Sequence, residues 1–239
     1  MQVSQLQLYT VVDPHLRRPP AWGIYGFDPD DILYVLDEYP NVEYGHYSQN
    51  KKAVYYEQIK DRRFGYKEEI RAFYELEQKW GGNIIKRFID PRHGATKVAN
   101  TNRTVMEEYR VVARDQGIDM RFYKAVVGTD SGMGEIASGV HLIQERLKHD
   151  VDLGIPPGIF INPNCQNHDR MFKYHKYRNR TGKAAEGRGI SEEFEEKYKD
   201  HSDLLRYLLK SVKGYKQPRT YDHEESRVYR PTVSSITGY

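Results

Sequence analysis

The chain has 239 residues, of which 38% are hydrophobic and 13% aromatic, including 20 Tyr. This length and aromatic content allow one large domain or two small ones with a real core, and they exclude a globally disordered chain. No apolar run reaches the ~18 residues of a membrane-spanning helix, and the N-terminal residues do not form a secretory signal. The net charge of +3 is too small to identify a nucleic-acid partner by itself. The single cysteine, Cys165, excludes a disulfide framework, and we expect a structural, at least partly buried residue.

The N-terminal part of the chain is predicted to form three strands in close succession. Residues 6–12 have the alternating, β-branched pattern of a strand, which ends at an Asp-Pro pair beginning with Asp13. Residues 21–27 and 32–36 follow two Pro-containing turns and are predicted as the second and third strands. Because the connections are short, we expect an antiparallel meander.

Helices and strands alternate in the rest of the chain. The fourth strand, at 84–89, ends at a second Asp-Pro pair, which begins with Asp90. Gly81 and Gly117 stop the first two helices, and Ser191 caps the last one. The other predicted elements are helices at 67–80, 104–117, 131–147 and 191–212, a strand at 120–127, and a short strand or buried loop at 156–161.

This order of elements is that of the ribonuclease H-like fold. We therefore predict an α/β domain over residues 1–213, with a ribonuclease H-like mixed five-stranded sheet flanked by helices. Residues 41–64 are polar and rich in Tyr, and their pattern predicts no regular element. Residues 214–239 show no periodicity, and we expect a flexible C-terminal tail there.

Acidic side chains follow two strands that this fold places next to each other. Asp13 ends the first strand and Asp90 the fourth, and the carboxyl ends of adjacent parallel strands meet at one edge of the sheet. Asp200 and Asp203 lie on the last helix, which can pack over the same edge. Converging carboxylates repel one another unless cations neutralise them, and oxygen ligands suit Mg²⁺ or Mn²⁺. The simpler alternative is that each Asp-Pro pair only starts a turn and the helical acids are solvated.

Three short stretches carry a more specific combination of residues. They are 9–15 with the strands that follow it, 87–91 (Arg-Phe-Ile-Asp-Pro) and 199–207 (Lys-Asp-His-Ser-Asp-Leu-Leu-Arg-Tyr), and a Gly-rich entry into a helix at 132–147 lies between the last two. In this order and spacing they resemble the C-terminal nuclease domain of the tailed-bacteriophage terminase large subunit. The resemblance covers about residues 5–212.

The resemblance implies that Asp13, Asp90 and Asp203 are the catalytic, metal-binding acids. Asp200 lies one helical turn before Asp203, where a further metal ligand or a hydrogen-bonding partner is expected. Leu204 stands where the family usually has Ala, so the division of roles between Asp200 and Asp203 stays open.

Four further side chains are candidates for accessory roles. Glu38 either supports the site or is an ordinary acid at the end of a strand. The others are His15, His93 and His201, which lie close in sequence to the acids. The histidines of the two Asp-Pro turns can reach phosphate or water, although a loop histidine is usually just exposed.

Basic residues gather in three loops that we expect to grip DNA phosphates without reading bases. They are Lys51, Lys52, Arg62 and Arg63 in the first loop, Arg92, Lys97 and Arg103 in the second, and Arg178, Arg180, Lys183 and Arg188 in the third. Any one of these runs is otherwise a solvated surface.

The family resemblance also implies a mechanism and partners. One Mg²⁺ or Mn²⁺ ion would lower the pKa of a bound water and a second would stabilise the leaving 3′ oxygen, so no side-chain nucleophile is needed. Partners would be double-stranded DNA, a terminase ATPase domain, the small terminase subunit and the portal, in the host cytoplasm at the viral procapsid, with no membrane. The fragments 128–132 and 181–184 lack the spacing of a G-x-x-x-x-G-K-[ST] loop, so we expect no ATPase in this chain.

Two alternatives to this endonuclease remain open at the level of the sequence. The first is another ribonuclease H-like nuclease, such as a junction resolvase or an enzyme that cleaves RNA–DNA hybrids. The second is a catalytically silent DNA-binding module of the packaging machinery, whose acids never bind metal.

Overall fold

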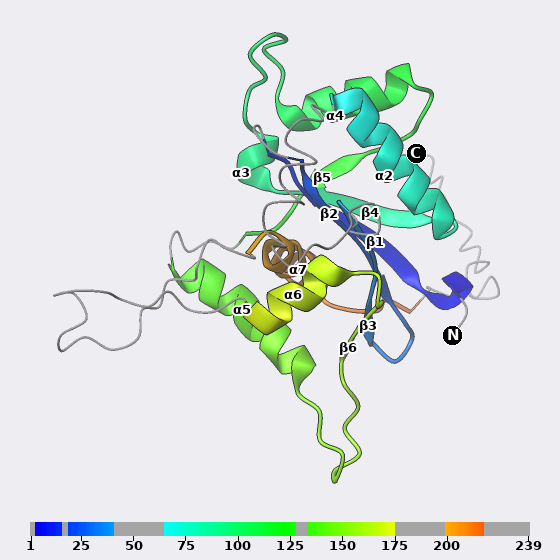
Figure 1. The fold of residues 1–239 in the computed structure, drawn as a ribbon, viewed down its shortest axis with the longest axis vertical. Helices are drawn as coiled ribbons and strands as arrows, with labels where there is room; N and C mark the ends of the chain where they lie inside the picture. The colour runs from blue at the N-terminus through cyan, green and yellow to red at the C-terminus, as the bar shows by residue number, and fades with distance from the viewer. Residues whose placement is uncertain (1–2, 16–18, 41–64, 128–132, 175–198, 218–239) are drawn as a thin grey trace, which may run out of the picture.

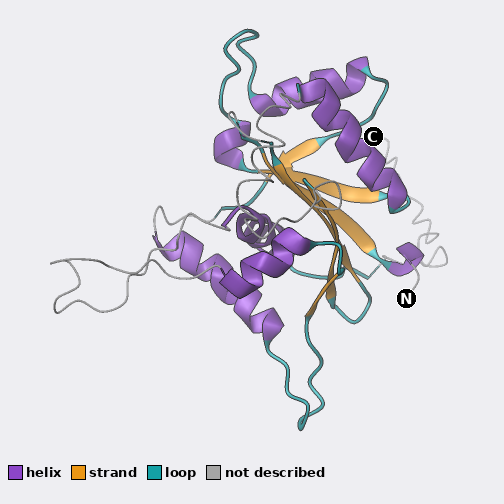
Figure 2. Ribbon diagram, viewed as in Figure 1, coloured by secondary structure: helices purple, strands orange, loops and turns teal. Residues whose placement is uncertain are grey.

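The structure, a computed structural model, describes residues 3–15, 19–40, 65–127, 133–174 and 199–217. Their centre is a mixed six-stranded sheet with the order β5-β4-β1-β2-β3-β6, and helices lie on both of its faces (Figures 1 and 2). The strands are β1 (Gln7–Asp13), β2 (Ala21–Phe27), β3 (Leu33–Tyr39), β4 (Ile84–Ile89), β5 (Phe122–Lys124) and β6 (Ile159–Ile161). The helices are the 3₁₀ turn η1 (Val3–Gln5), α2 (Tyr66–Lys79), α3 (Pro91–Gly94), α4 (Val105–Asp115), α5 (Met133–Leu147), α6 (Gln166–Tyr174) and α7 (Lys199–Ser211).

The strand pairing confirms the predicted meander and the predicted neighbour of the first strand. β2 pairs antiparallel with both β1 and β3, and β4 pairs parallel with β1, with Val12 opposite Ile89. The carboxyl ends of β1, β3 and β4 therefore share one edge of the sheet.

The prediction of five strands is wrong by one. β6 has three residues and pairs parallel with β3, which makes it the sixth strand. Residues 156–161 are apolar but too short for their pattern to distinguish a strand from a buried loop. Two helices were also not predicted, because α3 is a single turn and α6 is short and largely polar.

Local signals explain the ends of the predicted helices. The Thr104 hydroxyl accepts a hydrogen bond from the backbone N–H of Glu107, whose side chain accepts from the Thr104 backbone, so a capping box begins α4. Gly82 and Gly117 have φ angles of +71° just after α2 and α4, a conformation that favours glycine and stops a helix. The first turn of the predicted helix at 191–212 lies outside the described residues, which begin again at 199.

The core has two parts, one on each face of the sheet. On one face α2 and α4 cover the sheet, and the rings of Trp22 and Phe73 stack with centroids 3.9 Å apart. On the other face lie α5, α6 and α7, and Leu204 and Leu205 of α7 are fully buried. Cys165 is also fully buried, as predicted for a structural residue. Apolar packing on α7 therefore fixes the helix that carries the C-terminal acids.

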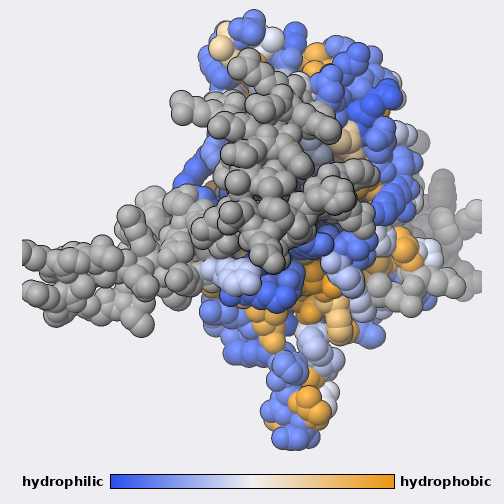
Figure 3. Space-filling model, in the orientation of Figure 1, coloured by the Kyte–Doolittle hydropathy of each residue, from blue (hydrophilic) through white to orange (hydrophobic). Residues whose placement is uncertain are grey.

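A projecting loop on the described surface carries apolar side chains. The loop between α5 and β6 extends away from the body of the molecule, and hydrophobic residues are visible on it (Figures 1 and 3). Val151 and Leu153, on this loop, are 84% and 74% exposed. In the part of the chain that the structure describes, no helix combines the length and the apolar character needed to cross a bilayer.

Glu69 on α2 predicts a stability effect that depends on pH. Its carboxylate is buried and accepts a hydrogen bond of 2.8 Å from the Tyr109 hydroxyl, and burial raises the pKa of Glu69 to about 7. Because the folded-state pKa lies above the ordinary value, protonated Glu69 stabilises the fold fully below about pH 4.5, and this contribution is lost as the pH rises through 7. We expect Glu69→Gln to be about 2–3 kcal/mol more stable than the wild type at pH 8 and equal to it at pH 4.5.

Urea unfolding at several pH values measures this difference directly. Glu75→Gln changes an exposed residue of the same helix and is the matched control, which should follow the wild-type curve. Parallel curves for the wild type and Glu69→Gln would contradict the prediction.

Candidate active site at the carboxyl edge of the sheet

Two aspartates meet where the central strands end. Asp13 is the last residue of β1 and Asp90 directly follows β4, and their exposed fractions are 2% and 3%. The backbone N–H of Asp90 donates to the carbonyl of Val12 at 2.9 Å, so the parallel ladder continues to the residue before Asp13. The two Asp-Pro pairs thus lie side by side at one edge of the sheet.

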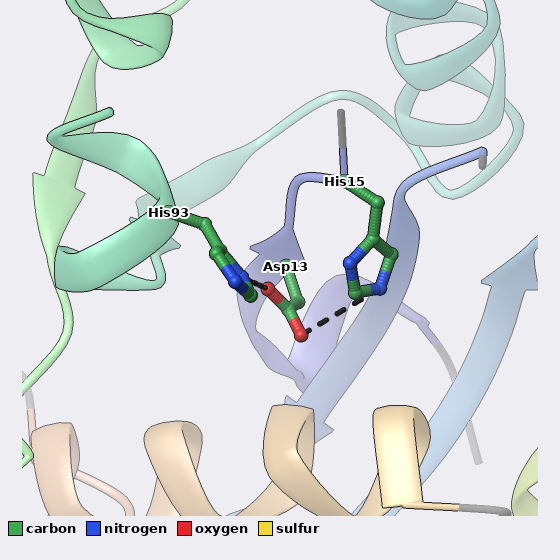
Figure 4. Close-up of side chains that lie close together, drawn as sticks. All are labelled: Asp13, His15 and His93. Atoms are coloured by element: carbon green, nitrogen blue, oxygen red, sulfur yellow. Dashed lines mark hydrogen bonds and ion pairs between the residues drawn. The ribbon is translucent and has the colours of Figure 1, made fainter. Parts of the chain in front are cut away.

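His93 bridges the two carboxylates. Its Nδ1 lies 2.7 Å from Oδ1 of Asp13 (Figure 4). The same nitrogen lies 3.4 Å from Oδ2 of Asp90. The turn that places it is built by Asp90 itself, whose Oδ1 accepts from the backbone N–H of Arg92 at 2.6 Å and of His93 at 3.3 Å and so caps α3. The hydrogen bond to Asp13 raises the pKa of His93. His93 is half exposed, but its contact with Asp13 makes it part of the site and not merely an exposed loop histidine.

His15 joins the first aspartate to α7. Its Nε2 lies 3.8 Å from Oδ2 of Asp13 and 3.8 Å from Oδ1 of Asp200. The rings of His15 and His93 lie on either side of the Asp13 carboxylate, as Figure 4 shows. Asp13, His15 and His93 offer donor atoms that all lie within 4.8 Å of one another, so this group can hold a metal ion.

α7 contributes the remaining acid and two residues that hold acids in place. Arg206 donates to Oδ1 of Asp203 at 2.7 and 3.2 Å, and the Tyr207 hydroxyl donates to Oδ2 of Asp90 at 2.9 Å. Asp203 is close enough for its charge to act on both Asp13 and Asp90. The sequence motif contained Arg206 and Tyr207 but gave no role to either. Their spacing of three and four residues from Asp203 is the signal that places them on one helical face.

The electrostatics of the site fit a divalent cation. Burial raises the pKa of Asp13 to about 6, and the charges of Asp90 and Asp203 act in the same direction. Burial also raises the pKa of Asp203, against the opposing effect of Arg206. Carboxylates that are buried and mutually repelling are stabilised by a bound cation.

Glu38 and His201 lie in a different group of side chains. Glu38, at the end of β3, is fully buried, and its Oε2 lies 2.8 Å from Nδ1 of His168 on α6 and 3.9 Å from Nε2 of His201 on α7. The sequence did not single out His168, because α6 was not predicted and a lone histidine carries no signal. Glu38 is an acid at the end of a strand, as one interpretation of the sequence had it, but its partners are two buried histidines.

Only one of the predicted DNA-gripping loops lies within the described residues. Arg92, Lys97 and Arg103 are exposed on α3 and on the loop between α3 and α4, which projects from the body beside the site (Figure 1). Lys97 Nζ donates to Asn102 at 3.2 Å, and Arg103 lies 3.4 Å from Glu108. The other predicted residues fall outside the described ranges: Lys51, Lys52, Arg62, Arg63, Arg178, Arg180, Lys183 and Arg188.

Comparisons with known proteins show what the fold resembles. No family model and no curated protein sequence matches the chain. The large terminase of a thermophilic bacteriophage, in complex with ADP, superposes with a TM-score of 0.53 at 15% identity, over 86% of this chain and 39% of that chain. Another crystal form of the same enzyme gives a TM-score of 0.52 at 16% identity. The P22 large terminase nuclease domain gives 0.48 at 11% identity, over 86% of this chain and 81% of that chain.

Because these sequence identities are low, the comparisons show a similarity of fold alone. The chain spans about two fifths of the thermophilic phage's large terminase that it matches. The resemblance predicted from the sequence is confirmed at the level of the fold: this chain has an α/β fold similar to that of part of a phage large terminase.

Proposed function

We propose that this chain is a metal-dependent endonuclease that cleaves concatemeric viral double-stranded DNA during genome packaging. One observation carries the proposal: Asp13 and Asp90 end adjacent parallel strands, lie within 3.4 Å of the same His93 nitrogen, and interact with the charge of Asp203 from α7. The likeness of the fold to a large terminase supports it.

In this proposal Asp13, Asp90 and Asp203 hold Mg²⁺ or Mn²⁺, and Asp200 is an accessory group linked to them through His15. A bound pair of such ions supplies an activated water and stabilises the leaving oxygen in phosphodiester hydrolysis. The protein's own part is to hold each carboxylate in a defined position, because a site that is pre-organised needs no rearrangement when the substrate binds.

Each of the three acids has an oxygen fixed by a neighbour. His93 holds Asp13, and Arg206 holds Asp203. Tyr207 holds Oδ2 of Asp90, whose Oδ1 is fixed by the α3 backbone. The half-exposed ring of His93 also keeps a proton beside Asp13, where a phosphate oxygen of DNA can approach it.

The exposed basic residues give the substrate a place to bind. Arg92 directly follows the Asp90-Pro91 pair, and Lys97 and Arg103 follow on the projecting loop. Contacts of this kind go to phosphates and position a duplex without reading its sequence. We therefore propose double-stranded DNA as substrate. From the likeness to a large terminase we also propose an ATPase domain, a small terminase subunit and the portal as partners, at a procapsid in the host cytoplasm.

Cleavage of supercoiled plasmid DNA is the test of this proposal. We expect nicked and linear products with Mn²⁺ or Mg²⁺ and none with excess chelator, and linear duplex should be cut at least as fast as a four-way junction or an RNA–DNA hybrid. Faster cleavage of the junction or the hybrid would favour another nuclease with this fold. No cleavage, together with no thermal stabilisation by either ion, would indicate a silent DNA-binding module.

A further inference from the structure

A second group of potential metal ligands, which shares no residue with the first, lies inside the molecule. Glu38 of β3, His168 of α6 and His201 of α7 offer three donor atoms within 4.8 Å of one another. The side chains of Glu38 and His168 are completely buried and that of His201 is 10% exposed. The rings of the two histidines meet edge to face with their centroids 4.8 Å apart. Three elements that are distant in sequence thus converge on one small polar centre in an apolar region.

We propose that Glu38, His168 and His201 form a site for Zn²⁺ or a similar transition-metal ion. Two imidazole nitrogens and one carboxylate oxygen are a zinc-type donor set, whereas Mg²⁺ prefers oxygen ligands and bound water. The proposal is independent of the proposed nuclease function, because none of the three residues is among the acids assigned to cleavage.

Two of the three separations between ligand atoms are close to those around a tetrahedral ion. Zinc lies ~2.0–2.1 Å from its nitrogen and oxygen ligands, so two ligand atoms of a tetrahedron are about 3.3 Å apart. Oε2 of Glu38 lies 2.8 Å from Nδ1 of His168 and 3.9 Å from Nε2 of His201. These values lie on either side of the ideal separation, so small shifts of the side chains are enough to accommodate the ion.

The surroundings hold two of the ligands in place. The second oxygen of Glu38 accepts from the backbone N–H of Asn167 at 2.7 Å. Nε2 of His168 lies 2.9 Å from the buried Tyr25 hydroxyl. Metal-binding histidines almost always use their other ring nitrogen in such a hydrogen bond. With Nδ1 on the metal, Nε2–H would donate to the Tyr25 oxygen.

The charge of the group also suits a cation. Burial lowers the pKa of His168 to about 3, so the ring is neutral and has a lone pair to offer. Burial raises the pKa of Glu38, which means that a nearby positive charge would stabilise its ionised carboxylate. On binding, the ion would replace the proton that lies between Oε2 of Glu38 and Nδ1 of His168, and that proton would go to solvent.

Without a metal, the same contacts form a hydrogen-bonded network that links α6 to β3. The following experiment distinguishes a metal site from such a metal-free network. The starting protein is the full chain without an affinity tag, carrying Asp13→Asn and His93→Gln so that the other candidate site is removed. After equilibration with Zn²⁺ and dialysis, we expect one zinc per chain and a rise in Tm of about 5 °C or more at saturation. Adding His201→Gln should abolish both effects, whereas His141→Gln, which changes an exposed histidine of α5, should leave them intact.

Two results would overturn the proposal: no zinc retained by the starting protein, or the same zinc content with and without His201→Gln. Because a buried substitution can prevent folding, X-ray absorption at the zinc edge of the loaded starting protein gives an independent answer. We expect two imidazole ligands per zinc; a spectrum with one or none would equally reject the site.

Discussion

Asp13→Asn is expected to abolish DNA cleavage, reducing the rate by at least about 100-fold, while the fold remains intact. Asp13 lies between two histidines of the site, because one of its oxygens contacts His93 and the other lies 3.8 Å from His15. Asparagine has nearly the same shape but lacks the negative charge that holds a cation. The measurement is plasmid cleavage in Mn²⁺ by the purified variant and the wild type.

Stability gives this prediction a second readout. In the metal-free protein, Asp13 is buried beside two other acids, and burial raises its pKa to about 6. Removing that charge should therefore raise Tm by about 2–4 °C at pH 8 in the presence of chelator. Mn²⁺ should stabilise the wild type more than the variant, because the variant has lost a ligand.

Asp119→Asn is the matched control, since it removes the same charge from an exposed position. It should cleave DNA at the wild-type rate and keep the wild-type Tm. Full activity of Asp13→Asn would remove Asp13 from the site. A lower Tm in chelator would show that the carboxylate stabilises the metal-free fold.

Arg87→Met is expected to destabilise the fold by about 3–5 kcal/mol, the largest stability effect that we predict. Arg87 of β4 forms two parallel hydrogen bonds with Glu77 of α2, from Nε at 2.8 Å and from Nη2 at 2.7 Å. Glu77 is fully buried, and its carboxylate has one other hydrogen-bonding partner among the described residues, the Thr10 hydroxyl at 3.4 Å. Without the guanidinium, a carboxylate is left in the core with no opposite charge.

The double variant Arg87→Met/Glu77→Met separates the charge from the packing. It should recover most of the lost stability, because replacing both members of a buried ion pair with apolar residues is often neutral. Urea unfolding of the wild type, both single variants and the double variant gives the coupling energy. Arg121→Met, which breaks an exposed ion pair with Asp119, is the control and should change stability by no more than ~0.5 kcal/mol. A double variant as unstable as Arg87→Met would contradict the prediction.

The strands that carry the first two acids could be predicted because their signals are local. A run of β-branched residues that ends at an Asp-Pro pair marks the end of a strand, and β1 and β4 do end at Asp13 and directly before Asp90. The helical spacing of apolar residues likewise predicted α2, and Gly117 marked the end of α4. Each of these elements has a pattern that is repeated over six residues or more.

The sequence alone therefore determined the order of the longer elements, the ends of the central strands and the acids that stand there. Only the tertiary structure decided that His93 turns back onto Asp13, that Tyr207 reaches Asp90 from 117 residues away, and that Glu38 faces His168. The tertiary structure also decided that residues 159–161 form a strand, β6, because they pair with β3. The reason is physical: periodicity and capping act between residues a few positions apart, whereas these contacts depend on how the sheet and α7 pack, and packing brings together residues whose local sequence carries no sign of their partners.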